Sequence, residues 1–358
     1  MIINSINNFL LNLQKIPISE KIFFIQHLRV LIRSGVSLSS ALNVLSQQSN
    51  NKKFRKILID IKNNVEKGDT FSKSLKKHKK VFNDFFINMI QAGENSGKLE
   101  ETLNQIFIQI KKDHDIKSKV KGAMIYPSVV LGAMIGIGAL MIIFVIPKIT
   151  SIFVESNIKL PLITRILIGI SDFAINHGIL VTILLTIFII GFTYLIKTKK
   201  GKYYFHLTLL HLPIFGKIIK KINLARFARS LSSLLKTDIP IAKTLKMTSE
   251  ILGNVIYKEA INEASEKVIE GISIAKTLKD KKFIFPPVVT EIILVGEETG
   301  SLDNVLIEMA EFYEEEIDQT MKNLPSIIEP VLILILGIGV ALMAVAIIMP
   351  IYSLTEAI

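Results

Sequence analysis

The sequence predicts an all-α membrane protein with two homologous cytoplasmic helical-bundle domains, of about six helices each, and three transmembrane helices. The first observation is an internal duplication, because residues 24–147 align with residues 227–350 at a constant offset of 203 and without a gap. The second is that each copy begins with a soluble helical pattern and ends in a long apolar stretch. No segment keeps the alternating period of a strand, so we expect no sheet.

The duplication and the apolar stretches divide the chain into consecutive segments. In chain order we expect an N-terminal amphipathic segment (1–20), a first cytoplasmic helical domain (21–122), a first transmembrane helix (123–147), an external loop (148–172), a second transmembrane helix (173–196), a cytoplasmic connector (197–222), a second cytoplasmic helical domain (223–325), a third transmembrane helix (326–349) and an external tail (350–358). Each span has the roughly 20 apolar residues that a bilayer core of about 30 Å requires. The amphipathic segment can lie on the bilayer, contact a partner or pack on its own domain.

The distribution of basic residues orients these segments. Residues 1–123 contain 21 Lys and Arg against 10 Asp and Glu, and residues 197–324 contain 19 against 17. The only basic residues in the loop 147–172 are Lys148, Lys159 and Arg165. Because Lys and Arg are enriched in cytoplasmic loops, we expect the N-terminus and both domains in the cytoplasm and the loop outside.

The helices of the first domain have recognisable ends. Gly35 is expected to end the first helix in the left-handed conformation, and Ser37 to cap the second. The third helix is expected to end at Gly68, and Asp69 or Thr70 to cap a short fourth helix.

A seven-residue turn follows the fifth helix in both copies. Its fixed residues are Gly93, Glu94, Gly97 and Leu99 in the first copy and Gly296, Glu297, Gly300 and Leu302 in the second. We expect Gly93 to end the fifth helix, and Gly97 or Gly300 to adopt a positive φ. Glu94 and Glu297 are weak candidates for a divalent-cation site; we favour a role in which each glutamate satisfies free N–H groups at the start of its own helix.

Prolines and glycines mark the membrane spans. Pro127 and Pro330 occupy matched positions near the starts of the first and third spans, where proline is expected to end or kink the helix. Small residues recur in the same spans, at Gly132, Gly136, Gly337 and Gly339. They permit close helix packing, either between copies of the chain or between its own two spans.

The composition gives little support for catalysis or transport. The chain has no cysteine, and we find no Ser/His/Asp grouping, no metal-ligand spacing and no phosphate-binding loop. We therefore expect no catalytic residue, no cofactor and no directly bound nucleic acid. A membrane transporter or channel subunit is the alternative function, disfavoured because the spans lack Asp, Lys and Arg at mid-depth.

One run of basic residues distinguishes the two copies. The first contains Lys76, Lys77, Lys79 and Lys80, whereas the matched segment of the second includes Asp280. The run is a candidate contact for an anionic lipid surface, for an acidic patch on a protein partner, or only for solvent.

The duplicated turns, Ala92–Leu99 and Val295–Leu302, resemble those of the type II secretion F family. The matched prolines and the three spans strengthen this resemblance, which covers roughly residues 20–350. The segment Leu31–Leu38 also resembles the family's start, and its copy departs from that pattern at Asp238.

The resemblance implies a non-enzymatic platform in a bacterial or archaeal-type inner (cytoplasmic) membrane. Such platforms serve type IV pilus and type II secretion machines. They couple a hexameric assembly ATPase to the polymerisation of pilin or pseudopilin subunits. The resemblance also implies contacts with other inner-membrane machine components and a homo-oligomeric state.

Overall fold

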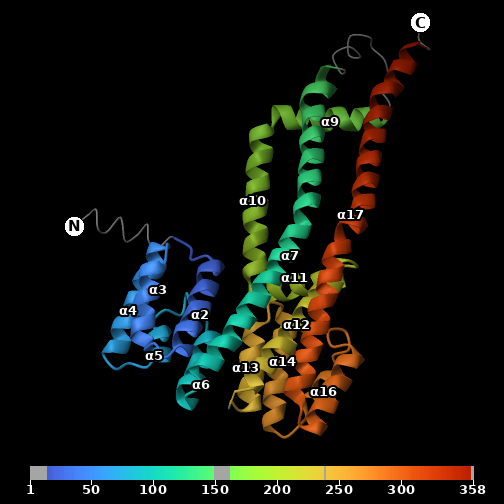
Figure 1. Ribbon diagram of the computed structural model, residues 1–358. Coiled ribbons are helices and arrows are strands. Elements are labelled where there is room, and N and C mark those ends of the chain that lie inside the picture. The colour runs from blue at the N-terminus through green and yellow to red at the C-terminus, as the bar shows by residue number, and fades with distance from the viewer. Residues whose placement is uncertain (1–13, 149–161, 238, 356–358) are drawn as a thin grey trace. The chain divides into compact units, whose positions relative to one another are not determined.

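The computed structural model describes residues 14–148, 162–237 and 239–355, and every regular element within these ranges is a helix (Figure 1). The prediction of an all-α chain is therefore confirmed for the described residues. The chain divides into two compact units. Unit 1 contains the chain up to Lys117 and His206–Ile317, and unit 2 contains Ser118–Phe205 and Asp318–Ile358.

Unit 1 contains the soluble part of both repeats. The first repeat supplies α2 (Ile18–Arg33), α3 (Leu38–Gln48), α4 (Lys52–Glu66), α5 (Phe71–Lys76), α6 (Asp84–Ser96) and the start of α7 (Leu99–Leu140). The second supplies α12 (Phe215–Leu235), α13 (Ile241–Ile251), α14 (Val255–Ile269), α15 (Ile274–Lys279), α16 (Pro287–Thr299) and the start of α17 (Leu302–Thr355). Each repeat thus has the six helices that the sequence predicts.

Local chemistry accounts for most helix ends. Ser37 caps α3 by accepting a hydrogen bond from the Ser40 N–H at 3.3 Å, as predicted. Gly35 and Gly68 have φ of 80° and 92° and follow the ends of α2 and α4. The prediction that Gly93 ends the fifth helix is wrong, because α6 continues to Ser96.

The same aromatic positions form the core of both repeats. In the first, Phe24 packs edge-on against Phe54 at a centroid distance of 5.6 Å, and Phe82 lies 6.1 Å from Phe24. The residues 203 positions later are Phe227, Tyr257 and Phe285, and Phe285 lies 5.4 Å from Phe227 and 5.3 Å from Tyr257. Tyr257 donates from its hydroxyl to the Ile284 carbonyl at 2.8 Å, which satisfies the one polar atom added to this core.

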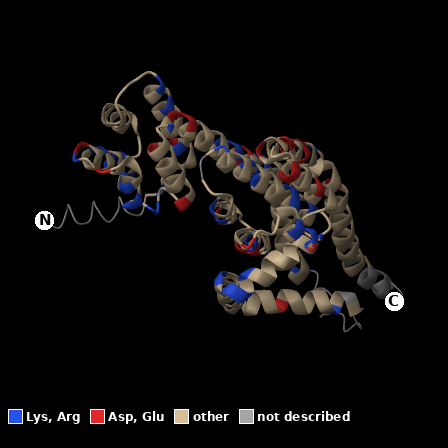
Figure 2. Ribbon diagram, turned by 90° about the horizontal axis from the view of Figure 1, so that it is seen from below, with Lys and Arg blue, Asp and Glu red and all other residues tan. Residues whose placement is uncertain are grey.

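Unit 2 contains the apolar helices. Within the described residues, three helices are long and apolar enough to cross a membrane, and they cover Leu99–Lys148, Gly178–Lys197 and Leu302–Ala346. Near its end the first of these contains a five-residue π-helical segment, η1 (Met141–Val145). The second is α10 (Gly178–Lys197). In Figure 2 the stretch of α17 that leads to the C-terminus is largely without charged residues.

The boundaries around α10 differ from those expected. The second span was expected from residue 173, but α10 begins at Gly178, and residues before it form α9 (Leu162–Asn176). The helix breaks at His177, whose φ of −122° and ψ of 24° are not helical. In Figure 1, α9 runs across the direction of α10. Because the residues at this break carry no charge, the charge-free stretch in the sequence continues across it. The sequence therefore predicted one span where the structure has two helices.

Two further segments contain more helix than expected. The connector 197–222 contains α11 (Lys199–His211) and the first turns of α12. The tail expected from residue 350 is still helical, because α17 continues to Thr355. Residues 1–13 of the amphipathic segment, 149–161 of the external loop, and Asp238 lie outside the described residues.

Candidate functional site

The glutamate that the two turns share caps a short helix that lies earlier in the chain. Glu94 accepts hydrogen bonds from the backbone N–H groups of Phe71 and Ser72, at 2.5 and 2.9 Å. These are the first two residues of α5, and Thr70 accepts from the third, Lys73, at 3.2 Å. A helix begins with N–H groups that have no partner within the helix, and a carboxylate also complements the positive end of the helix dipole.

The second repeat contains the same arrangement. Glu297 accepts hydrogen bonds from the N–H groups of Ile274 and Ala275, at 2.7 and 3.0 Å. The Ser273 side chain accepts one from the N–H of Lys276. The sequence therefore identified the right chemistry and the wrong helix, because each glutamate caps a helix more than 20 residues before it rather than its own. Nothing in local spacing reveals this contact, but its recurrence at the same offset could have suggested it.

The two glycines of each turn have different roles. Gly93 and Gly296 lie in α6 and α16, and both are buried. A Cβ atom at Gly93 would overlap Thr102, and one at Gly296 would lie 2.5 Å from a methyl group of Val305. These positions therefore let the following long helix approach closely.

The second glycines make the turn itself. Gly97 has φ 71° and Gly300 has φ 68°, and each is the C-cap of its helix. This is the left-handed conformation that the sequence predicts, and it starts α7 and α17 at Leu99 and Leu302.

The partners of both turn glutamates are backbone N–H groups. Both oxygens of each carboxylate accept backbone hydrogen bonds. Among the described residues no group of three or more His, Asp or Glu side chains is close enough to hold a metal ion. The motif therefore fastens α5 to α6 and α7, and its repeat fastens α15 to α16 and α17.

Polar side chains join the two repeats within unit 1. Gln109 of α7 donates to the Ser230 hydroxyl of α12 at 2.9 Å, and both residues are buried. Within the second repeat, the buried Arg229 donates two hydrogen bonds, of 2.9 and 3.0 Å, to Glu314. Lys112 of the first repeat reaches the same Glu314 at 2.7 Å.

Further contacts extend this joint. Arg226 of α12 pairs with Asp113 of α7 at 2.5 Å. Leu234 and Met247 of the second repeat are buried in the hydrophobic core of the first. The two soluble domains therefore share buried surface, which a reading of each repeat by itself did not anticipate.

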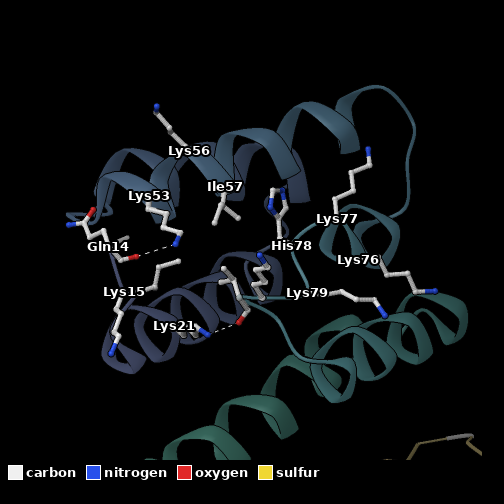
Figure 3. Close-up of a pocket in the computed structure, with 13 residues that line it drawn as sticks. Gln14, Lys15, Lys21, Lys53, Lys56, Ile57, Lys76, Lys77, His78 and Lys79 are labelled. Atoms are coloured by element: carbon white, nitrogen blue, oxygen red, sulfur yellow. Dashed lines mark hydrogen bonds between the residues drawn. The ribbon is translucent and has the colours of Figure 1, made fainter. Parts of the chain in front are cut away.

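The basic run lies beside lysines from other parts of the first repeat. Lys76 ends α5, and Lys77, Lys79 and Lys80 follow it in the turn before α6. They line a hollow together with basic residues that the sequence analysis did not single out, namely Lys15, Lys21, Lys53 and Lys56 (Figure 3). Only the fold brings these positions together, because they are distant in the sequence.

The membrane-entry prolines do not end a helix. Pro127 lies within α7 and Pro330 within α17, and both helices continue beyond them. The alternative that predicted a helix end is wrong. At the span glycines Gly132, Gly136, Gly337 and Gly339, an added Cβ would meet no described atom within 4 Å. The described chain therefore shows no close packing between its own spans at these glycines, and an oligomer contact there stays a prediction.

These features define a class of protein, a multi-pass membrane protein built from a duplicated helical domain. The family described as "Type II secretion system (T2SS), protein F" matches residues 24–147 and 227–350, which are more than half of the chain. The chain belongs to this family.

Relatives in the family serve two kinds of machine. The chain is 32% identical to a type IV pilus assembly protein PilC of Thermus thermophilus, over 92% of this chain and 81% of the relative. It is 34% identical to a protein of the same name from Myxococcus xanthus, over 94% and 80%. It is 31% identical to a type II secretion system protein F of Aeromonas hydrophila, over 98% and 90%. The three apolar helices and this family together support a multi-pass inner-membrane protein.

Proposed function

We propose that the protein is a non-enzymatic inner-membrane platform that couples a cytoplasmic assembly ATPase to the polymerisation of pilin or pseudopilin subunits. One observation carries the proposal. The helices α7 and α17 each begin in the soluble unit and continue, without a helix end, into an apolar stretch long enough to span a bilayer. A continuous helix transmits displacement along its axis, so movement of a soluble domain would reach the membrane directly.

The paired soluble domains suit this role. Buried polar contacts and a shared core hold the two repeats together, so a partner that moves one also acts on the other. We infer that the cytoplasmic domains, within residues 21–122 and 223–325, bind a hexameric ATPase. We also infer that the spans contact pilin or pseudopilin, other inner-membrane components and further copies of this chain.

The test of coupling uses the full-length protein in membranes. The ATPase encoded beside it should co-purify with it, and the chain alone should hydrolyse no ATP. ATP turnover that survives stringent purification, or an ATPase that fails to associate in membranes, would contradict the proposal. A deletion strain scored for pili, DNA uptake and secretion would then identify the machine by the one phenotype that is lost.

The proposed topology has its own test. Reporter fusions after Lys112 and Asp280 should both report cytoplasm, and a fusion at Asn157, which lies outside the described residues, should report the outer side. A cytoplasmic signal at Asn157 would exclude the three-span arrangement.

A further inference from the structure

The first repeat contains a hollow whose lining is strongly basic. Its volume is about 1240 Å³. Eight of the lining residues are lysines, His78 is a ninth basic group, and no Asp or Glu lines it. The lysines are Lys15, Lys21, Lys53, Lys56, Lys76, Lys77, Lys79 and Lys80.

Several parts of the fold supply these lysines. Figure 3 shows Lys53 and Ile57 of α4 on one side of the hollow and Lys21 of α2 on the other. The segment before α2 and the turn after α5 complete the lining. The basic character therefore depends on the folded domain and extends beyond the run at residues 76–80.

Carboxylates outside the lining compensate only part of this charge. Lys77 pairs with Asp69 at 3.2 Å, Lys79 with Asp84 at 2.9 Å, and His78 lies 2.8 Å from Asp60. The ammonium groups of three exposed lysines make no hydrogen bond or ion pair within the described part of the chain; these are Lys15, Lys76 and Lys80.

Lys21 is the most constrained lysine of the lining. It is half-buried and donates to the Val81 carbonyl at 2.5 Å, with no carboxylate partner among the described residues. Burial lowers the pKa of its ammonium group below the ordinary value. An anionic ligand in the hollow would offset the cost of burying the Lys21 ammonium group, because a nearby anion favours the charged form of the amine.

The second repeat does not keep this basic character. At the positions matched to Lys53, Lys56, Lys77 and Lys80 it has Ile256, Glu259, Asp280 and Phe283. The Phe283 ring stacks on His211 at a centroid distance of 4.5 Å, and the Lys220 ammonium lies 3.6 Å from its centroid. Lysines remain at two matched positions, Lys279 and Lys282, whereas the four lysines named above are replaced by an acidic, aromatic or aliphatic residue.

We propose that the lysine-lined hollow of the first repeat, defined by the eight lysines above, binds a multiply charged phosphate-bearing anion. A concave site lined by one sign of charge concentrates counter-ions, and lysine binds phosphate as a compact point charge. One phosphate chain or headgroup can neutralise several lysines within one small hollow, whereas carboxylates of a peptide contribute one charge each. This inference does not rest on the proposed platform function.

The experiment uses the full-length protein in nanodiscs of neutral phosphatidylcholine. Tripolyphosphate is the soluble probe, and nanodiscs that also contain cardiolipin, whose headgroup carries two phosphates, are the lipid probe. Amine acylation followed by mass spectrometry measures the accessibility of each lysine. We expect Lys15, Lys76 and Lys80 to react more slowly with one of the probes present, while Lys276, Lys279 and Lys282 of the second repeat are unaffected. Protection by tripolyphosphate identifies a soluble ligand, and protection by cardiolipin alone identifies a lipid headgroup.

Matched variants supply the control. The substitutions Lys15→Gln, Lys76→Gln and Lys80→Gln together should weaken binding of the protecting probe by about tenfold or more, given the gain that each lysine makes near an anionic surface. The substitutions Lys276→Gln, Lys279→Gln and Lys282→Gln remove the same charge from exposed sites and should leave binding unchanged. Equal protection of both lysine sets, no protection by either probe, or protection only when the assembly ATPase is added would overturn the proposal.

Discussion

The two repeats keep the same interior and differ at the surface. The aromatic core positions coincide, and the glutamate cap recurs with the same two N–H partners at the same offset. By contrast, Lys80, which lines the basic hollow, is matched by Phe283, a ring stacked on His211. Packing and backbone hydrogen bonding constrain the interior of each copy, because a core defect or an unsatisfied buried group costs stability in either one. Surface positions were free to diverge toward separate contacts.

The long helices of the two repeats also diverged in charge, and here the difference is complementary. Lys111 and Lys112 of α7 are matched by Glu314 and Glu315 of α17. Lys112 pairs with Glu314, so a basic position of one repeat contacts an acidic position of the other. Complementary charges favour this pairing over that of two like copies, in which matched charges would repel. Duplication within one chain therefore allowed the two domains to become partners.

The largest expected effect concerns this joint. Glu314→Ala should lower the free energy of unfolding by about 3–4 kcal/mol, because the exposed Glu311 carboxylate, 3.8 Å away, is then the remaining ion-pair partner of the buried Arg229 guanidinium among the described residues. The matched change Lys111→Ala should cost less than about 1 kcal/mol, since this lysine is exposed and its ammonium group lies over the Phe107 ring. Thermal unfolding of the full-length protein in detergent measures both. Similar losses of stability for the two variants would contradict the prediction that Glu314 contributes more to stability than the matched Lys111.

The glutamate caps should instead behave alike in the two repeats. Glu94→Ala and Glu297→Ala should each cost about 3 kcal/mol, because two N–H groups of a short helix lose charged partners. Hydrogen exchange should quicken in α5 for the first variant and in α15 for the second. Exchange that quickens equally in both helices after one substitution would contradict separate capping.

The packing glycines offer a finer distinction. Gly93→Ala should cost about 2 kcal/mol and Gly296→Ala less, within the range for overpacked cores. A Cβ at Gly93 would lie 2.8 Å from the Cβ of Thr102, which cannot move without shifting α7, whereas at Gly296 the closest atom is a Val305 methyl group and the Leu302 backbone lies 3.0 Å away. Melting temperatures of the two variants measure the difference, and a larger loss at Gly296 would contradict this ranking.

The turn glycines should respond to backbone strain alone. Gly97→Ala and Gly300→Ala should each cost about 1 kcal/mol, because an L-residue is strained at their positive φ. A Cβ at either position meets no described atom within 4 Å, so no steric term adds to the strain. Gly97→Asn is the control and should recover part of the loss, since asparagine tolerates this conformation. Equal losses for alanine and asparagine would point to a cause other than φ.

The sequence predicted features that depend on local chemistry or on length. The positive φ of Gly97, the Ser37 cap and the six helices per repeat follow from turn chemistry and helical period. It did not predict contacts that join distant segments, such as Glu94 with α5 or Arg229 with Glu314. It also missed the break at His177, because Asn176, His177 and Gly178 carry no charge and a stretch defined by the lack of charge runs across them. The basic hollow was visible only as the run at residues 76–80, since its other lysines come from separate elements.

The smallest expected effect is on acid stability, and it again separates the repeats. Each repeat has one carboxylate between two lysines, but at unmatched positions: Asp69 with Lys73 and Lys77, and Glu263 with Lys267 and Lys281. Hydrogen bonds from these lysines lower the pKa of both carboxyl groups. A carboxyl group with a lowered folded pKa stabilises the native state above its unfolded pKa, and this contribution is lost as the pH falls through the folded pKa.

Neutralising either carboxylate should therefore flatten the loss of stability between its unfolded and folded pKa values, on the acid side of 4.5 for Glu263 and of 3.8 for Asp69. For Glu263→Gln the change should stay below about 0.5 kcal/mol, because solvent screens an exposed ion pair. Asp69→Asn should act in the same direction over a more acidic window. Melting temperatures of both variants and the unchanged protein, measured from pH 6 to pH 3 in a fixed detergent, provide the comparison. If the two curves flatten over the same window, the acid response belongs to the charge of the whole unit, and if neither flattens, these pairs contribute nothing to folding. If the effect of Glu263→Gln appears at a higher pH than that of Asp69→Asn, each repeat has its own acid-sensitive ion pair, at positions that the two repeats do not share.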